Sequence, residues 1–334
     1  MKRVAVIGAG SWGTALAIHL ARNGHDVRLW VREPELLEAM RQTGENTMFL
    51  PGFPLPGAVR PCHRFDEALA DSGLVVSAVP SHGTRDVLRA AAPFMEPSAT
   101  IVTATKGLEP NTLLRVSEVI TEELGEGHRV VALSGPSFAV EVARQLPTAV
   151  SAASTDAAAA EHVQKEFRAR YFRIYTTDDV VGVEIGAALK NVIAIAAGVV
   201  EGLGLGHNSL AALVTRGLAE ISRLACALGG RRETLAGLSG LGDLILTCTG
   251  SLSRNHQVGV QLGRGRSLDE ILSGMTMVAE GVRTTHAALA LGTRHGVELP
   301  IAAQMAEVLA GRKEARVAAE DLMLRPQRVE PESR

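Results

Sequence analysis

The sequence predicts an α/β protein, in which a doubly wound, mainly parallel sheet is followed by an all-α C-terminal domain. Short apolar runs alternate with helical stretches up to about residue 180, and a glycine-rich turn separates the first run from the first helix. Beyond that point the strand signals vanish, and helical stretches rich in Ala, Leu and Gly continue to about residue 324. We therefore expect domains at residues 1–180 and 181–324, and a polar, proline-bearing, disordered tail at 325–334.

Composition narrows the classes of function. With 334 residues, of which 46% are hydrophobic, the chain can form one large or two medium globular domains. The formal net charge is -2, so the chain lacks the excess of basic residues that is typical of nucleic-acid-binding proteins, and nucleic acid is not expected as a partner. The three cysteines, Cys62, Cys226 and Cys248, are too few and too scattered for a disulfide framework or a CxxC zinc site. We expect no metal, and a reducing compartment.

The N-terminal stretch MKRVAVIGAGSWGTALAIHLARNG has the basic start and apolar content of a signal peptide. Its glycines divide it, however, into a β-branched strand at 4–7 and a helix at 14–23, which Gly24 ends. A second strand follows at 27–31, so the stretch is typical of a βαβ unit. In the helical domain no span longer than fourteen residues lacks a charge, and a transmembrane helix needs roughly 20 apolar residues. We expect a cytoplasmic protein without membrane insertion.

The turn after the first strand has the pattern G-x-G-x-x-G. Gly8 permits the tight turn, Gly10 lets the backbone approach a pyrophosphate, and Gly13 lets the helix pack on the strand. The amides at the start of the helix then face the anion. Between two strands, this pattern predicts a Rossmann-type dinucleotide site. Arg32 follows the second strand ahead of Glu33, which favours NADP over NAD and leaves use of both cofactors open.

Further strands are predicted at 73–79, 99–104, 129–133, 148–152 and 171–175. In a doubly wound sheet, ligands bind beyond the carboxyl ends of the strands. The loops that contain Pro80, Lys106 and Gly135 each follow such an end, so we expect all three to face one crevice.

Lys190 and Asn191 interrupt the apolar stretch 179–200, which otherwise belongs in a core. An unpaired buried ammonium is expensive, so Lys190 either reaches solvent, forms a salt bridge near a helix end, or lines a polar cavity. In a cavity its pKa would be lowered, which suits proton exchange near neutrality.

Three polar and glycine-rich islands lie further along the helical domain. Asp243 could cap a helix or act in a site. The Ser253-Arg254-Asn255 segment is typical of a helix start, where an arginine and free amides bind phosphate well. The third island contains Glu280. The chemistry of these residues alone does not decide whether each segment has a structural or a functional role.

These segments also occur, in this order, in a known family: GAGSWGTALA (8–17), NTMFLPG (46–52), AVPSH (78–82), ATKGLE (104–109), LSGPSFAVEV (133–142), LKNVIAIAAG (189–198), SGLGDLILTC (239–248), SRN (253–255) and VAEGVRTT (278–285). From residue 1 to about 320 the chain resembles bacterial-type NAD(P)-dependent glycerol-3-phosphate dehydrogenases. That family often has tyrosine where Phe49 stands, so we expect this chain to lack a hydroxyl contact there.

The resemblance implies roles for individual residues. Lys190 would be the general acid and base. The residues implied in substrate binding are Lys106, Gly135, Ser137, Lys190, Asp243, Ser253, Arg254 and Asn255. Those implied in binding the dinucleotide, together with Gly8, Gly10 and Gly13, are Ser11, Trp12, Arg32, Lys106, Ala139, Arg254, Val278 and Glu280.

The resemblance further implies reversible reduction of dihydroxyacetone phosphate to sn-glycerol 3-phosphate by NAD(P)H, which supplies phospholipid synthesis. The helices rich in small residues allow a homodimer. A first alternative is another dehydrogenase of this architecture, acting on a hydroxy acid or a sugar nucleotide. A second is a catalytically silent NAD(P)-binding regulator. Such a regulator would lose Lys190, Asp243 or Arg254, and all three are present.

Overall fold

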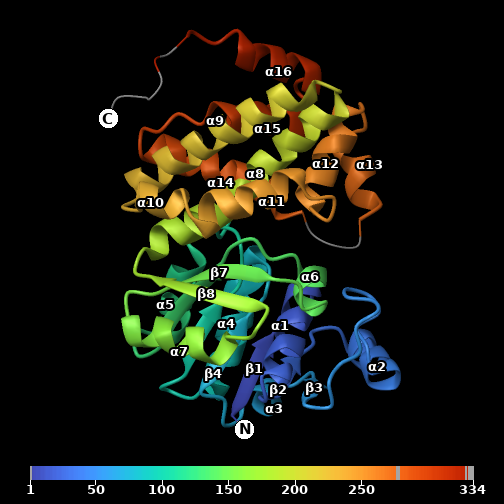
Figure 1. The fold of residues 1–334 in the computed structure, drawn as a ribbon, viewed down its shortest axis with the longest axis vertical. Coiled ribbons are helices and arrows are strands. Elements are labelled where there is room, and N and C mark those ends of the chain that lie inside the picture. Colours follow the sequence, from blue (N-terminus) through green and yellow to red (C-terminus); the bar gives the residue numbers. More distant parts are fainter. Residues whose placement is uncertain (1, 276–278, 328, 330–334) are drawn as a thin grey trace.

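The computed structural model describes residues 2–275, 279–327 and 329. Figure 1 shows the sheet below and the helical domain above it. The eight strands of the sheet lie in the order β3-β2-β1-β4-β5-β6-β7-β8. Their bounds are β1 Arg3–Ile7, β2 Asp26–Trp30, β3 Val59–Cys62, β4 Leu74–Ser77, β5 Thr100–Thr103, β6 Arg129–Ser134, β7 Thr148–Ala153 and β8 Phe172–Thr177.

Neighbouring strands are parallel, except that β6 and β7 pair antiparallel. The mainly parallel, doubly wound sheet is therefore confirmed, and all seven predicted strands are present with small shifts at their ends. The prediction missed β3, a four-residue edge strand that contains Pro61. Proline is tolerated in a sheet at such an edge, but it weakens the strand signal in a sequence.

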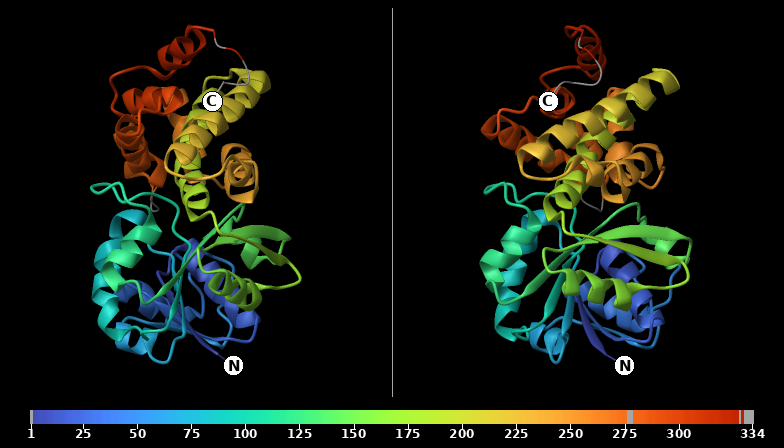
Figure 2. Two further views of the ribbon diagram at one scale, coloured as in Figure 1. Left: turned by 90° about the vertical axis from the view of Figure 1, so that its left-hand side faces the viewer. Right: turned by 60° about the vertical axis from the view of Figure 1, so that its left-hand side comes forward.

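Helices cover both faces of the sheet (Figure 2). Val4 and Val6 pack on one side with α1 and α7, whereas Ala5 and Ile7 pack on the other with α3, α4 and α5. This double burial explains why the strand sequences are apolar throughout instead of alternating. The helices of this half are α1 Ser11–Arg22, α2 Pro34–Thr43, α3 Phe65–Leu69, η1 Ser81–Gly83, α4 Thr84–Ala91, η2 Ala92–Phe94, α5 Val116–Leu124, α6 Ala139–Ala143 and α7 Ala157–Phe167.

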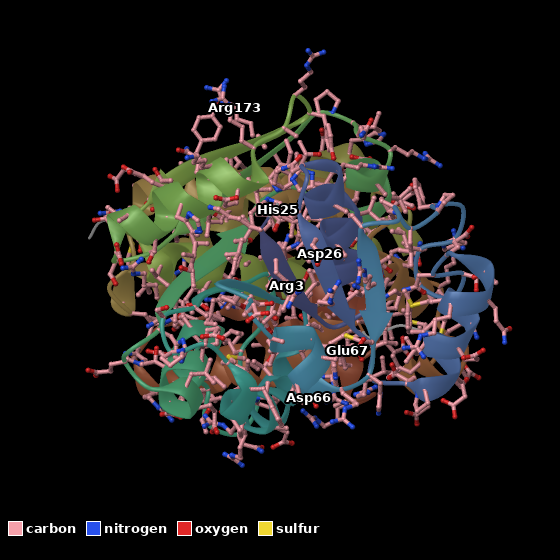
Figure 3. All side chains as sticks on the ribbon, turned by 90° about the horizontal axis from the view of Figure 1, so that it is seen from below. Arg3, His25, Asp26, Asp66, Glu67 and Arg173 are labelled. Carbon is pink, nitrogen blue, oxygen red and sulfur yellow. The ribbon has the colours of Figure 1, made fainter. Side chains whose placement is uncertain are left out.

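The amino ends of β1 and β2 lie at the lower edge of the sheet, far from the helical domain. Viewed from below in Figure 3, Arg3, His25 and Asp26 lie together at this edge. Arg3 Nε is 3.6 Å from Asp26 Oδ2, and Arg28 Nη1 is 2.8 Å from Asp26 Oδ1. Ion pairs thus occupy this edge, and the ligand-binding edge expected for such a sheet is the opposite one.

The helical half is built around α8 Val180–Gly202, which is buried from Gly182 to Val200. This helix is long and apolar enough to cross a membrane, but 89% of its most apolar window is buried inside the protein, as in a core helix of a soluble protein. The other helices are α9 Gly206–Ala227, α10 Arg232–Leu235, the π-helical turn η3 Leu238–Gly242, α11 Asp243–Thr249, α12 Arg254–Gly263, α13 Leu268–Ser273, α14 Glu280–Arg294, α15 Pro300–Leu309 and α16 Ala315–Met323.

Glycines bring α8 and α12 into backbone contact. A Cβ atom on Gly198 would lie 2.0 Å from His256 O, and one on Gly259 would lie 1.9 Å from Ile195 O. No other residue fits at either position without moving a helix. The crossing holds the start of α12 beside the middle of α8, where Lys190 and Asn191 lie.

Candidate active site

The glycine turn lies where the order of strands reverses, between β1 and β4. Gly8 has a φ of +109°, and a Cβ on it would lie 2.9 Å from Ala78 O, just beyond β4. A Cβ on Gly13 would lie 1.9 Å from Gly8 O, whereas no atom of the part of the chain that the structure describes lies within 4 Å of a Cβ on Gly10. Gly8 and Gly13 therefore serve close packing, and the backbone at Gly10 borders open space that an anionic group can approach.

The start of α1 is suited to an anion. It has no side-chain cap and no acidic residue in its first turn, so its amides and its dipole favour negative charge. The segment 46–52 closes over it, because Ser11 Oγ donates to Phe49 O at 2.6 Å and Asn46 Nδ2 donates to Ala9 O at 2.8 Å. Trp12 Nε1 is buried nearby, and it has no hydrogen-bond partner among the residues that the structure describes. These features fit the pyrophosphate of a dinucleotide.

Arg32 follows the carboxyl end of β2, and its side chain is exposed. Its guanidinium Nη2 lies 2.6 Å from Glu33 Oε1, so both charged residues noted in the sequence project at this point. The pair can open toward a 2′-phosphate or present its carboxylate to a ribose, which agrees with the use of either cofactor.

Two lysines share one carboxylate at the centre of the site. Lys190 Nζ donates to Asp243 Oδ1 at 2.9 Å and to Thr247 Oγ1 at 2.7 Å. Lys106 Nζ donates to Asp243 Oδ2 at 2.8 Å and to Gly135 O at 2.9 Å. The arrangement joins the loop after β5, the turn after β6, the middle of α8 and the start of α11.

Ser137 lies at the edge of this cluster, 3.4 Å from Lys106 Nζ, and its hydroxyl donates to Gly135 O. Gly135 has a φ of +143°, and a Cβ there would lie 2.9 Å from Val150 Cα. The turn after β6 therefore requires glycine, and the turn aims a carbonyl at Lys106.

Burial and neighbouring charge set the protonation of the cluster. Burial lowers the pKa of Lys190 to about 8; the Asp243 carboxylate opposes this shift, and the nearby Lys106 charge adds to it. Burial alone would raise the pKa of Asp243, but Lys106 and Lys190 outweigh it and hold that pKa below its usual range. With two ammonium groups and one carboxylate, the cluster is suited to an anionic ligand.

The alternatives that the sequence left open for two residues can now be decided. Lys190 is 5% exposed and lies in the middle of α8, so it does not reach solvent; it forms a buried salt bridge with Asp243, the first residue of α11. Asp243 begins α11, but its carboxylate contacts the two lysines and makes no capping hydrogen bond. Both side chains belong to the polar cluster.

The start of α12 lies beside this cluster. Ser253 caps the helix, since its Oγ accepts a hydrogen bond from His256 N at 3.2 Å, and the Arg254 side chain that follows is exposed. Asn255 is buried; its Nδ2 donates to Asn191 Oδ1 at 3.0 Å, and its Oδ1 accepts from Gly281 N at 3.0 Å. The predicted helix start is confirmed, and it links α8, α12 and α14.

Glu280 begins α14 and reaches the sheet half, where its Oε1 accepts a hydrogen bond from Ser81 N at 3.0 Å. Burial raises the pKa of Glu280. Ala139 begins α6, which packs against α1. Val278 lies outside the described residues.

Sequence reasoning did not single out Thr247 or Ser81. Thr247 lies four residues after Asp243, so the two share one face of α11, and that spacing was a usable signal. Ser81 contributes its backbone amide, for which the sequence carries no signal. Among the residues that the structure describes, no group of three His, Cys, Asp or Glu is placed to hold a metal.

Comparison with known proteins assigns the chain. It matches the family descriptions "NAD-dependent glycerol-3-phosphate dehydrogenase N-terminus" over residues 3–160 and "C-terminus" over residues 179–320. A glycerol-3-phosphate dehydrogenase (NAD(P)+) of Acidobacterium capsulatum is 54% identical over 338 residues, which cover 99% of this chain and 100% of that protein.

Solved structures agree with this assignment. The glycerol-3-phosphate dehydrogenase of Coxiella burnetii superposes with a TM-score of 0.94 at 38% identity, over 97% of this chain and 99% of that one. The corresponding protein of Saccharomyces cerevisiae superposes with a TM-score of 0.82 at 27% identity, over 96% of this chain and 98% of that one. This chain belongs to the NAD-dependent glycerol-3-phosphate dehydrogenase family.

Proposed function

We propose that the chain is an NAD(P)-dependent sn-glycerol-3-phosphate dehydrogenase, which reversibly reduces dihydroxyacetone phosphate to sn-glycerol 3-phosphate. The observation that carries this proposal is the pair of lysines on Asp243, one from each half of the molecule, placed beside the glycine turn. The cluster carries excess positive charge where a phosphorylated ketone would react. In this family the product supplies glycerol phosphate for phospholipids.

The dinucleotide binds along the glycine turn. Bound NAD(P)H supplies the hydride that reduces the ketone carbon. Gly10 gives the pyrophosphate access to the backbone, Trp12 offers its indole N–H, and Arg32 favours NADP through a 2′-phosphate contact. The remaining contacts are assigned to Gly8, Gly13, Ser11, Lys106, Ala139, Arg254, Val278 and Glu280.

The substrate phosphate binds at the start of α12. Arg254 supplies a guanidinium fork, and the α12 dipole adds to the attraction. Held at this remote end, the substrate is oriented so that its carbonyl faces the lysines, and binding energy is used for alignment. The residues assigned to the substrate are Lys106, Gly135, Ser137, Lys190, Asp243, Ser253, Arg254 and Asn255.

Lys190 transfers the proton. An ammonium has three N–H donors, and Asp243 and Thr247 hold two of them, which leaves the third for the carbonyl oxygen of the substrate. As negative charge develops on that oxygen, Lys190 donates a proton and Lys106 stabilises the charge. In the reverse direction, the neutral amine of Lys190 removes the proton from the hydroxyl.

A substitution of Lys190 tests this role. Lys190→Ala removes the proton donor, so kcat should fall at least about a thousandfold, while NADPH binding measured by fluorescence stays within a few-fold of wild type. Lys165→Ala, which removes an exposed ammonium at the end of α7, is the matched control and should keep normal turnover. Near-normal turnover of the Lys190→Ala enzyme would refute the assignment.

The alternative hypothesis, that the chain is a dehydrogenase acting on another substrate, is tested with a panel of ketones. Wild-type enzyme should oxidise NADPH with dihydroxyacetone phosphate, and much more slowly with unphosphorylated keto acids, because these do not use the site at α12. A faster keto-acid reaction would favour a hydroxy-acid dehydrogenase, and no turnover at all would favour a silent regulator. Comparing NADPH with NADH in the same assay tests the preference assigned to Arg32.

Three further assignments complete the proposal. Residues 1–180 form the dinucleotide-binding domain and residues 181–324 the substrate-binding domain, which agrees with the end of β8 at Thr177 and the start of α8 at Val180. The enzyme is cytoplasmic, which cell fractionation tests. It forms a homodimer, for which exposed apolar side chains on α16, such as Val317 and Met323, offer a surface. Light scattering at micromolar concentration tests the dimer.

A further inference from the structure

Three residues beyond Lys106, the loop after β5 carries a buried carboxylate to which the proposed mechanism gives no role. Glu109 is 8% exposed, and Arg85 on α4 binds it through two parallel hydrogen bonds: Nε to Oε1 at 2.7 Å and Nη2 to Oε2 at 2.8 Å. The Thr112 hydroxyl also donates to this carboxylate. The hydrogen bonds from the Arg85 guanidinium hold the pKa of Glu109 below its usual range, so the Glu109 carboxylate is ionised at neutral pH.

The backbone that follows Glu109 forms a turn closed by two hydrogen bonds. Glu109 N donates to Leu114 O at 2.9 Å, and Leu113 N donates to Glu109 O at 2.9 Å. Leu108, on the other side, is 2% exposed and packs into the core of the helical half. The segment from Lys106 to Glu109 therefore runs between two anchors, an apolar one in the helical half and an ionic one on α4.

The same segment is enclosed from above. A Cβ on Gly107 would lie 2.6 Å from Ser81 Oγ and 3.3 Å from Glu280 Oε2. Ser81 belongs to η1, which leads directly into α4, the helix that carries Arg85. The Arg85–Glu109 pair thus fixes the loop to α4, and the turn that precedes α4 contacts Glu280 through Ser81 N.

Small movements of this loop would change the chemistry at Lys190. Lys106 and Lys190 bind opposite oxygens of Asp243, and the charge on Lys106 contributes to lowering the pKa of Lys190. If Lys106 moved away from Asp243, Lys190 would be the only lysine bound to that carboxylate and would no longer be repelled by the Lys106 charge. The pKa of Lys190 would then rise.

We propose that Glu109 is a positioning residue: through its two hydrogen bonds with Arg85 it holds Lys106 on Asp243. The inference rests on the proposed function. Wild-type turnover of dihydroxyacetone phosphate tests that function, whereas a difference between two matched variants tests the role of Glu109.

The variants are Glu109→Gln and Glu122→Gln. Glu122 binds the same guanidinium, with Arg85 Nη2 2.7 Å from Glu122 Oε2, but lies on the surface of α5. In each variant Arg85 keeps two carboxylates, so the fold should survive. We expect E109Q to lower kcat/KM for dihydroxyacetone phosphate about ten- to a hundredfold and to move the alkaline limb of its pH profile to higher pH. E122Q should stay within about twofold, with an unmoved limb, and Glu109→Asp, which keeps the charge, should recover part of the loss.

A merely structural role would lower the melting temperature of E109Q but leave its pH limb in place. The inference is overturned if E109Q, corrected for the fraction of active enzyme, matches E122Q in both kcat/KM and limb position. If E109Q does not accumulate as folded protein, Arg85→Lys, which keeps the charge but loses the fork, is measured against E122Q by the same criteria.

Discussion

At the scale of single residues, the site depends on two cations that share one buried anion. Each buried charge costs several kcal/mol unless it is paired, and a lone Asp243 cannot neutralise both Lys106 and Lys190. The unbalanced positive charge has two consequences. It adds to the effect of burial, which lowers the pKa of Lys190 to about 8, where a proton moves readily near neutrality, and it leaves the site short of an anion that a phosphorylated substrate supplies.

The pH dependence of the two reaction directions follows from this pKa. Reduction needs protonated Lys190, so kcat/KM for dihydroxyacetone phosphate should be level below about pH 8 and fall about tenfold per pH unit above it. Oxidation of glycerol 3-phosphate needs the neutral amine, so its kcat/KM should rise with pH and level off above about 8. Initial rates from pH 6.5 to 10 in both directions test the pair. A limb near 10.5, the ordinary value for lysine, contradicts the assignment.

At the scale of elements, helices and strands could be predicted from local sequence patterns, whereas contacts between residues far apart in the sequence could not. Apolar runs and glycines predicted seven strands, the first helix and the glycine turn, because these depend on neighbouring residues. The contact of Lys106 with Asp243 joins residues 137 positions apart, and no spacing rule predicts it. Asp243 illustrates the limit, since a helix cap and a lysine partner both place an aspartate at a helix start. Only the fold separates the two interpretations.

The glycine turn provides a matched pair of substitutions within one element. Gly13→Ala places a Cβ 1.9 Å from Gly8 O, so α1 must shift, and the free energy of unfolding should fall by about 1–3 kcal/mol. Gly10→Ala meets no atom of the described residues within 4 Å, so stability should change little, but its methyl group occupies the approach to the backbone. NADPH affinity of G10A should drop at least about tenfold. Urea denaturation and NADPH titration separate the two effects, and a destabilised G10A with normal affinity would contradict this division of roles.

At the scale of the whole molecule, the two halves are joined by polar contacts as well as by the site. Glu280 of α14 accepts from Ser81 N, and Glu184 of α8 accepts from Ser117 N at 2.8 Å and from Ser117 Oγ at 2.6 Å. Arg115 Nη1 completes the second junction, 2.8 Å from Glu184 Oε2. Because α8 also carries Lys190, its seating on α5 helps to set where the lysine lies relative to the sheet.

Glu184 should therefore contribute strongly to stability, although it touches no ligand. Glu184→Ala leaves the half-buried Arg115 without this partner and the Ser117 amide unsatisfied, so the free energy of unfolding should fall by about 3–5 kcal/mol. Glu201→Ala is the control on the same helix: Glu201 is exposed at the far end of α8, 3.3 Å from His256 Nε2, and should cost less than about 1 kcal/mol. Urea denaturation measures both. Equal midpoints for E184A and E201A would contradict this role and would mean that the junction at Ser117 adds nothing measurable to the stability of the protein.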